Sequence, residues 1–127
     1  HGDIFDAPEN HIAFAVNSEG YNDSGFAGLV SKNIWKELSN WPCELGTILT
    51  LKKDGKFYHA LVCHSLEDGW NNSSNYLAVC LDKIKTEDEI AIIQIGAGFV
   101  GTISGANTKL LRESMEKSSK KLVLYVY

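Results

Sequence analysis

The sequence predicts a single α/β domain of three layers (α/β/α), with helices on both faces of a central, mixed but mostly parallel sheet. Three observations lead to this class. Short apolar runs alternate with segments in which apolar residues recur every three or four positions. One pair of runs is joined by Asp54-Gly55, a hairpin signal that makes one strand pair antiparallel. Glycine-rich loops follow two of the other runs, an arrangement common in α/β proteins.

The N-terminal half contains three predicted strands and one helix. The run 11–16 (HIAFAV) reads as a short buried strand. Residues 25–39 carry a helical stripe of apolar side chains. The runs 46–51 and 57–63 flank the Asp54-Gly55 turn and are predicted to pair with each other.

The C-terminal half alternates between the two kinds of element. We expect helices over 74–84 and 104–117 and strands over 90–95 and 121–127. The intervening stretch 66–73 is rich in polar residues and reads as a surface loop. The predicted order is therefore strand, helix, strand, strand, helix, strand, helix, strand.

Composition limits the class of protein. A chain of 127 residues with 44% hydrophobic residues is one domain, here 1–127, with enough apolar surface for a core. It has no apolar run of about 18 residues and no secretion signal, so we expect no membrane partner. A net charge of −4 argues against sequence-specific binding of nucleic acid. Three cysteines, an odd count, indicate free thiols and an intracellular protein, cytoplasmic or nuclear, which we expect to be a monomer.

Four strand ends are predicted to meet at one edge of the sheet. Ligands of open α/β sheets bind outside the carboxyl ends of parallel strands, where the loops converge. In this chain those ends carry Asn17, His64, Gly96 and Tyr125. We therefore expect the ligand site along this edge.

Both glycine-rich loops begin at this edge. The loop 94–101 (QIGAGFVG) places glycines in a GxGxxG spacing, and the loop 17–28 (NSEGYNDSGFAG) adds three more glycines. Glycine lets successive backbone N–H groups approach an anion closely. One such loop is often only a tight turn from a strand into a helix, but two on one sheet can hold a diphosphate from both sides. The residues thus predict a phosphorylated, nucleotide-like ligand.

These motifs together resemble the macrodomain (Appr-1''-p processing) family. The opening Gly2-Asp3-Ile4 is similar to the family's Gly-Asp-hydrophobic start. Asn17 followed by the segment 24–27 resembles its first ligand loop, and 93–98 resembles its second, with the usual proline replaced. The family has a strand immediately before Gly-Asp, so we expect either a strand before residue 1 or a sheet with one strand fewer.

The resemblance implies a ligand and a set of contacts. The ligand would be ADP-ribose, free or attached to a macromolecule, with no other cofactor. Asp3 would accept a hydrogen bond from the adenine amino group beside the Ile4 N–H, Tyr125 would lie near the adenine, and Asn17 near the distal ribose. The remaining expected contacts, largely backbone N–H groups on the diphosphate, come from Ser24, Gly25, Phe26, Ala27, Gly96, Ala97, Gly98, Phe99 and Val100.

Further similarity at 51–58 and 122–126 points to the branch that contains the terminal ADP-ribose protein glycohydrolase. That branch uses a lysine and an aspartate where this chain has His64 and Val100. Another hydrolase branch has an aspartate where this chain has Ala27. Valine cannot act as a base, and histidine cannot form lysine's amine adduct. The sequence therefore favours a binding module and leaves enzyme activity open.

The alternative is a hydrolase that removes ADP-ribose from a conjugate, or a phosphatase acting on ADP-ribose 1''-phosphate. Its candidate catalytic residues are His64, Asn17 and Asp23. Each also has a structural interpretation: an edge histidine, a turn residue and an Asx turn. Asp3 could likewise be a helix cap or a surface charge.

Two other classes are disfavoured. Cys63-His64 lacks the paired spacing of a zinc site, so we expect no metal. A dinucleotide-dependent oxidoreductase would carry an acidic residue at the end of a second βα unit, which this chain lacks.

The phosphate assignment of the second glycine loop can be tested directly. Gly98→Glu is expected to abolish ADP-ribose binding in a folded protein, because the carboxylate fills the predicted nest and repels the diphosphate. Calorimetric titration measures the effect, with circular dichroism as the check on folding. A folded variant that binds like the wild type would show that this loop does not hold the phosphates.

Overall fold

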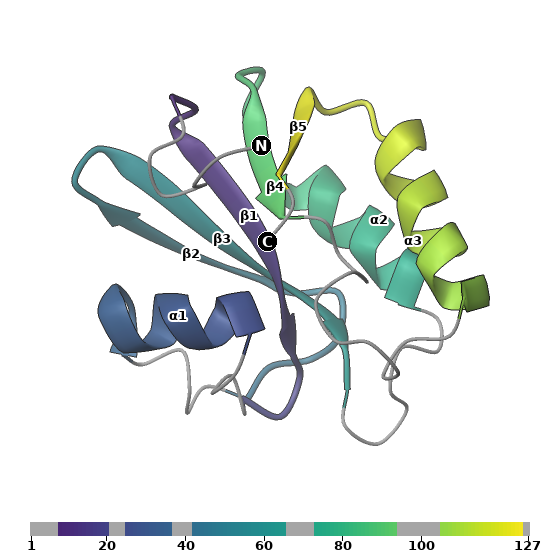
Figure 1. The fold of residues 1–127 in the computed structure, drawn as a ribbon, viewed down its shortest axis with the longest axis horizontal. Coiled ribbons are helices and arrows are strands. Elements are labelled where there is room, and N and C mark those ends of the chain that lie inside the picture. The colour runs from purple at the N-terminus through teal and green to yellow at the C-terminus, as the bar shows by residue number, and fades with distance from the viewer. Residues whose placement is uncertain (1–7, 21–24, 37–41, 66–72, 94–104, 126–127) are drawn as a thin grey trace.

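The computed structural model describes residues 8–20, 25–36, 42–65, 73–93 and 105–125. Eight helices and strands lie within these ranges (Figure 1). Their order along the chain matches the predicted order. The elements are β1 (His11–Asn17), α1 (Gly25–Asn33), β2 (Ile48–Lys53), β3 (Lys56–His64), α2 (Ser73–Lys83), β4 (Ile90–Ile93), α3 (Gly105–Lys117) and β5 (Leu122–Tyr125).

The five strands form one mixed sheet in the order β2-β3-β1-β4-β5. The pairs β3–β1, β1–β4 and β4–β5 are parallel, and only β2–β3 is antiparallel. Strand β1 is central: His11 is in register with Phe57 of β3 on one side and with Ile90 of β4 on the other. The predicted mixed, mostly parallel sheet is confirmed.

The Asp54-Gly55 hairpin is also confirmed. Lys53 pairs with Lys56, which leaves these two residues as the complete connection between β2 and β3. Asp54 has φ of 53° and Gly55 φ of 81°. Positive φ at both central positions defines a type I′ turn, whose twist matches that of the strands it joins. Glycine and aspartate are among the residues that adopt this backbone at low cost.

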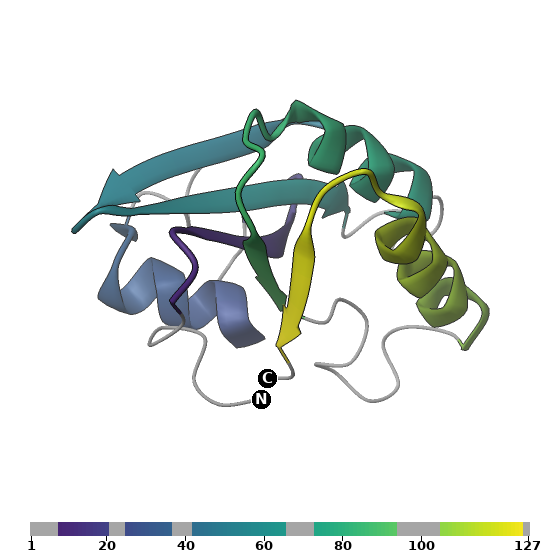
Figure 2. The same cartoon turned by 90° about the horizontal axis from the view of Figure 1, so that it is seen from above.

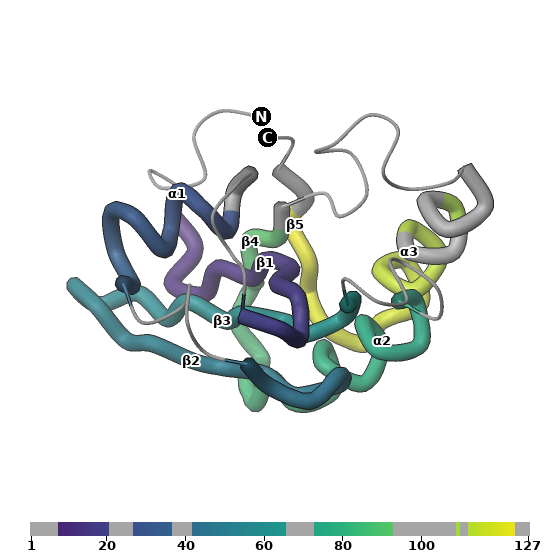
Figure 3. Tube along the Cα trace, turned by 90° about the horizontal axis from the view of Figure 1, so that it is seen from below, coloured from purple at the N-terminus to yellow at the C-terminus, as the bar shows by residue number. Residues whose placement is uncertain are grey.

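Helices cover both faces of the sheet, which confirms the three layers. Helix α1 lies on one face, and α2 and α3 lie on the other (Figure 2; Figure 3). Alternation along β1 sets this division, because successive side chains of a strand point to opposite faces. Ile12, Phe14 and Val16 belong to the apolar cluster under α1, whereas Ala13 and Ala15 contact the cluster under α2.

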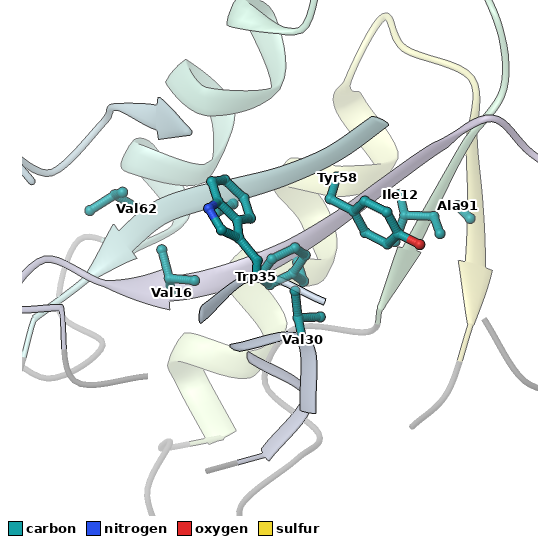
Figure 4. Close-up of a cluster of buried hydrophobic side chains, with 9 residues drawn as sticks. Ile12, Val16, Val30, Trp35, Tyr58, Val62 and Ala91 are labelled. Carbon is teal, nitrogen blue, oxygen red and sulfur yellow. The ribbon is translucent and has the colours of Figure 1, made fainter. Parts of the chain in front are cut away.

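The cluster on the α1 side is built around aromatic and β-branched side chains (Figure 4). Val30 enters it from α1, and Trp35, only 5% exposed, enters from the segment after that helix. On the other side, α2 contributes the residues predicted for its apolar face, with Ile84 just beyond its end. These residues are Leu77, Cys80, Leu81 and Ile84, all of them buried.

Helix α1 is shorter than the predicted 25–39. It ends at Asn33, where the N–H groups of Ile34 and Trp35 both donate to the carbonyl of Val30, at 2.9 and 2.7 Å. The second of these bonds is the wide turn that commonly closes a helix. It directs the chain back toward the sheet and places Trp35 in the core. Periodicity alone did not reveal this end, because the apolar stripe continues past it.

Strand β2 is displaced relative to the predicted 46–51 and runs from Ile48 to Lys53. Gly46 adopts φ of 87° and forms a turn before the strand begins. No helix within the described ranges is long and apolar enough to cross a membrane.

The central strand provides a direct test of the core. Phe14 has 0% exposure, so Phe14→Ala is expected to lower the free energy of unfolding by about 3–5 kcal/mol through lost burial and the cavity left behind. Val79→Ala is the matched control: this side chain is 46% exposed, so its change should stay within about 0.5 kcal/mol. Urea unfolding measures both, and equal losses would show that β1 is not the centre of the core.

Candidate functional site

The parallel strands end at one edge of the sheet, as predicted. Asn17 at the end of β1 is in register with His64 at the end of β3. On the other side of β1, Ile93 of β4 is in register with Tyr125 of β5. Asn17 and His64 therefore lie together where β1 and β3 end, which we call the carboxyl edge. Because Ala13 is in register with Ile92, Tyr125 is level with Phe14 and lies toward this edge but before Asn17 along the strands.

A local irregularity sets the position of Asn17. Val16 pairs with Val62, but the next residue pairs with His64, so β3 carries one additional residue at this point. Such a bulge bends the strand and redirects the side chains beside it. The chain is then held by a hydrogen bond of 2.9 Å from the N–H of Ser18 to the carbonyl of His64. Asn17 is left 7% exposed at the carboxyl edge.

The first glycine-rich loop, 17–28, begins with a tight turn. Gly20 adopts φ of 82°, a left-handed backbone that favours glycine. The carbonyl of Ser18 accepts a hydrogen bond of 2.8 Å from the N–H of Cys43. This second contact joins the start of the loop to a distant part of the chain. Ser18, which follows Asn17, is therefore hydrogen-bonded to two separate segments, at His64 and at Cys43.

His64 is uncharged at neutral pH. Its Nδ1 atom is buried, and burial lowers the pKa of its imidazole to about 4. The negative charge of Glu19 acts in the opposite direction but is the smaller effect. The Glu19 carboxylate accepts a hydrogen bond of 3.0 Å from the Ser18 hydroxyl. The carboxyl edge therefore presents a neutral imidazole beside an amide.

Helix α1 is the next element after β1 in the described part of the chain. Figure 1 shows its first turn on the same side of the molecule as the carboxyl end of β1, in the layer that covers this face of the sheet. The helix starts at Gly25 and has no acidic residue in its first turn, so no side chain of its own offsets the positive end of its dipole. The first N–H groups of a helix have no partners within it and are suited to an anion.

Several predicted site residues cannot be placed. Gly25 and Phe26 are described only as the backbone of α1, and Tyr125 only as backbone of β5. Ala27 is half-buried and packs against the core under α1, so its methyl group serves the core. The remaining candidates lie outside the described residues: Asp3, Ile4, Asp23, Ser24, Gly96, Ala97, Gly98, Phe99 and Val100.

The structure adds residues that the sequence did not single out. Ser65 follows His64 and is 6% exposed, and Ser18, Glu19 and Cys43 join the same edge. Glu19 could have been found from the sequence, because it is a carboxylate within the glycine-rich loop 17–28. Cys43 had no local signal, because only the folded chain brings its N–H to Ser18.

The three cysteines are free thiols with raised pKa values. Cys43, Cys63 and Cys80 are all free, as predicted. Burial raises the pKa of each thiol, to about 11 for Cys80, so they remain protonated at neutral pH. Within the described ranges, no group of three or more His, Cys, Asp or Glu residues is placed to hold a metal ion.

Solved macrodomain structures share this fold. The macrodomain of Mycobacterium tuberculosis DarG is similar with a TM-score of 0.68 at 15% identity, over 98% of this chain and 93% of that one. The macrodomain of Thermus aquaticus DarG gives 0.66 at 16% identity, over 99% and 93%. An alphavirus structure, P23pro-zbd, gives 0.65 at 16% identity over 96% of this chain but 20% of the other. No family model and no curated sequence matches. The chain has the macrodomain fold.

The state of His64 predicts a pH dependence of stability. Its pKa is about 4 in the folded protein against an ordinary value of 6.5, so between these values only the unfolded chain takes up the proton. The stability contributed by the neutral form is complete above pH 6.5 and is lost as pH falls toward 4. His59, also with a pKa of about 4, acts in the same direction.

We therefore expect His64→Gln to weaken the fall in unfolding free energy across this window. Urea unfolding at a series of pH values measures the slope for wild type and variant. Parallel curves for the two proteins would show that His64 titrates normally in the folded state.

Proposed function

We propose that this domain binds ADP-ribose, free or attached to a macromolecule, at the carboxyl edge of its sheet. The observation that carries the proposal is the direct pairing of Asn17 with His64 at that edge, on the macrodomain fold. The family resemblance expects an amide beside the distal ribose at the position of Asn17. The buried position of Asn17 gives that contact a fixed geometry.

Backbone groups supply the binding of phosphate in this proposal. Helix α1 follows β1 in the chain, and the glycine-rich sequence 94–101 follows β4, so both would supply N–H groups to the phosphates. Backbone N–H groups need no basic side chain to bind an anion, so a protein with net charge −4 can still hold a diphosphate. Asp3, Ile4 and Tyr125 would contact the adenine.

The charge state of His64 favours binding over catalysis. A general base works best when its pKa is near the working pH. An imidazole with a pKa of about 4 is a weak base at neutral pH and serves better as an uncharged hydrogen-bonding group. Val100 also stands where the glycohydrolase branch has an aspartate. The two residues together favour a module that binds ADP-ribose without hydrolysing it.

The alternative function is hydrolysis of an ADP-ribose conjugate, or of ADP-ribose 1''-phosphate. Glu19 is the observation in its favour, because its charge acts to raise the basicity of His64. A bound ligand that excludes water changes both the desolvation of His64 and the influence of the Glu19 charge on its pKa. The similarity to the glycohydrolase branch supports the same alternative.

Calorimetry with a series of ligands tests the proposal. ADP-ribose is expected to bind at least tenfold more tightly than AMP, because the two loops offer more N–H donors than one phosphate can use. A tenfold difference corresponds to about 1.4 kcal/mol of binding free energy. Equal affinities, or no binding of either at sub-millimolar concentration, would contradict the proposal.

Two controls separate its parts. Asp3→Ala should weaken ADP-ribose and ADP alike, by roughly 1.5–3 kcal/mol, and leave ribose-5-phosphate unaffected. Incubation with mono-ADP-ribosylated protein, mono-ADP-ribosylated nucleic acid and ADP-ribose 1''-phosphate measures turnover. If the wild type releases product from any of these substrates with turnover and His64→Gln does not, the protein is a hydrolase and not a binding module.

A further inference from the structure

A carboxylate lies beside the Asn17–His64 pair at the carboxyl edge. Glu19 is two residues beyond Asn17, within the loop 17–28, and its side chain is half-buried. Its negative charge acts on the imidazole of His64, the last residue of β3. The contacts proposed for ADP-ribose do not include Glu19, although it lies close to the amide expected at the distal ribose.

The backbone on either side of Glu19 is held in place. The N–H of Ser18 donates to the carbonyl of His64 at 2.9 Å, and the carbonyl of Ser18 accepts from the N–H of Cys43 at 2.8 Å. Gly20, the next residue, adopts φ of 82° and completes the turn. Glu19 therefore follows a residue that is hydrogen-bonded to the end of β3.

The Glu19 side chain has a partner in the same turn. Its Oε1 atom accepts a hydrogen bond of 3.0 Å from the Ser18 hydroxyl. A hydrogen bond to an ionised acceptor is stronger than one between neutral groups, and it restrains the position of the carboxylate. The charge is thus held at the start of the loop, within reach of the imidazole on which it acts.

The surroundings do not offset this charge with a basic side chain. Burial lowers the pKa of His64 to about 4, so its imidazole is uncharged at neutral pH. The described segments that meet here are 17–20, 42–45 and 64–65, and they contain no lysine or arginine. These segments therefore carry negative charge beside the predicted ribose contact.

This charge would act on the group attached to the distal ribose. The inference rests on the function proposed for this domain, in which Asn17 contacts that ribose. Its C1'' atom carries a hydroxyl, a phosphate or the linkage to a macromolecule. A carboxylate held in a partly desolvated place repels an anion and attracts a cation. A guanidinium suits it best, because its fork of N–H groups matches the two carboxylate oxygens.

We propose that Glu19 determines which group is accepted on the distal ribose, favouring ADP-ribose linked to an arginine side chain over ADP-ribose 1''-phosphate. The uncharged imidazole of His64 supports the same preference, because a charged imidazole would repel the guanidinium. Free ADP-ribose, with a neutral hydroxyl on C1'', ranks between the two. The preferred partner is therefore a protein that carries ADP-ribose on arginine.

Calorimetry with three ligands tests the proposal. They are ADP-ribose, ADP-ribose 1''-phosphate and ADP-ribosyl-agmatine, an alkylguanidine that has the linkage of ADP-ribosylated arginine. Affinities are expressed relative to that for ADP-ribose, which cancels effects on the shared nucleotide. We expect the 1''-phosphate to bind about 3- to 30-fold more weakly than ADP-ribose, and the guanidine about 3- to 30-fold more tightly. Higher ionic strength should reduce both differences.

Two variants assign these differences to Glu19. Glu19→Gln keeps the shape of the side chain and removes its charge, so all three ligands should bind within about threefold of one another. Glu44→Gln is the matched control: Glu44 is exposed and follows Cys43, so the variant removes the same charge from the same edge. It should keep the wild-type differences. Circular dichroism checks folding, and the wild-type ranking with its salt dependence decides the matter if Glu19→Gln is unfolded.

The outcomes distinguish this inference from the proposed function. If ADP-ribose binds but its 1''-phosphate binds as tightly or more tightly, the inference is wrong and the proposed function stands. Equal changes in Glu19→Gln and Glu44→Gln would show an effect of net charge alone, which also overturns the inference. If ADP-ribose itself does not bind, the proposed function fails and the inference fails with it.

Discussion

The parallel pairing of β1 with both β3 and β4 is the constraint on which the rest of the structure depends. Strand β1 is buried on both faces, and its apolar side chains enter two separate clusters. Because β1 runs in the same direction as both neighbours, the carboxyl ends of all three strands point to one edge. The candidate site is therefore a consequence of where the central strand ends, before any side chain is considered.

The two ends of this strand have different chemistry. At the carboxyl edge a bulge interrupts the register and sets Asn17 beside His64. At the other end the register is regular, and it brings His11 next to Phe57 and diagonal to His59. Regular pairing packs side chains against each other, whereas the bulge directs polar groups toward the loops. The same strand thus serves a ligand site and a cross-strand contact.

Desolvation governs the electrostatics at both ends. His59 and His64 each have a pKa lowered to about 4 by burial, although one faces another imidazole and the other is near a carboxylate. At His59 the neighbouring His11 lowers the pKa further, whereas at His64 loss of water outweighs the opposing charge of Glu19. The result is a domain in which the buried imidazoles of His59 and His64 are uncharged hydrogen-bonding groups at neutral pH. An uncharged imidazole of this kind fits the binding role that we propose better than it fits the activation of water.

The sequence by itself determined the order of the elements, the hairpin at Asp54-Gly55 and the edge that carries Asn17 and His64. These features follow from local patterns: periodicity, turn residues and the position of strand ends. Only the tertiary structure decided where α1 ends, that Ala27 belongs to the core, and that Cys43 fixes the start of the first loop. It also decided the meeting of His11 with His59. Those contacts join residues far apart in the chain, and their existence depends on strand register and burial, which no local pattern encodes.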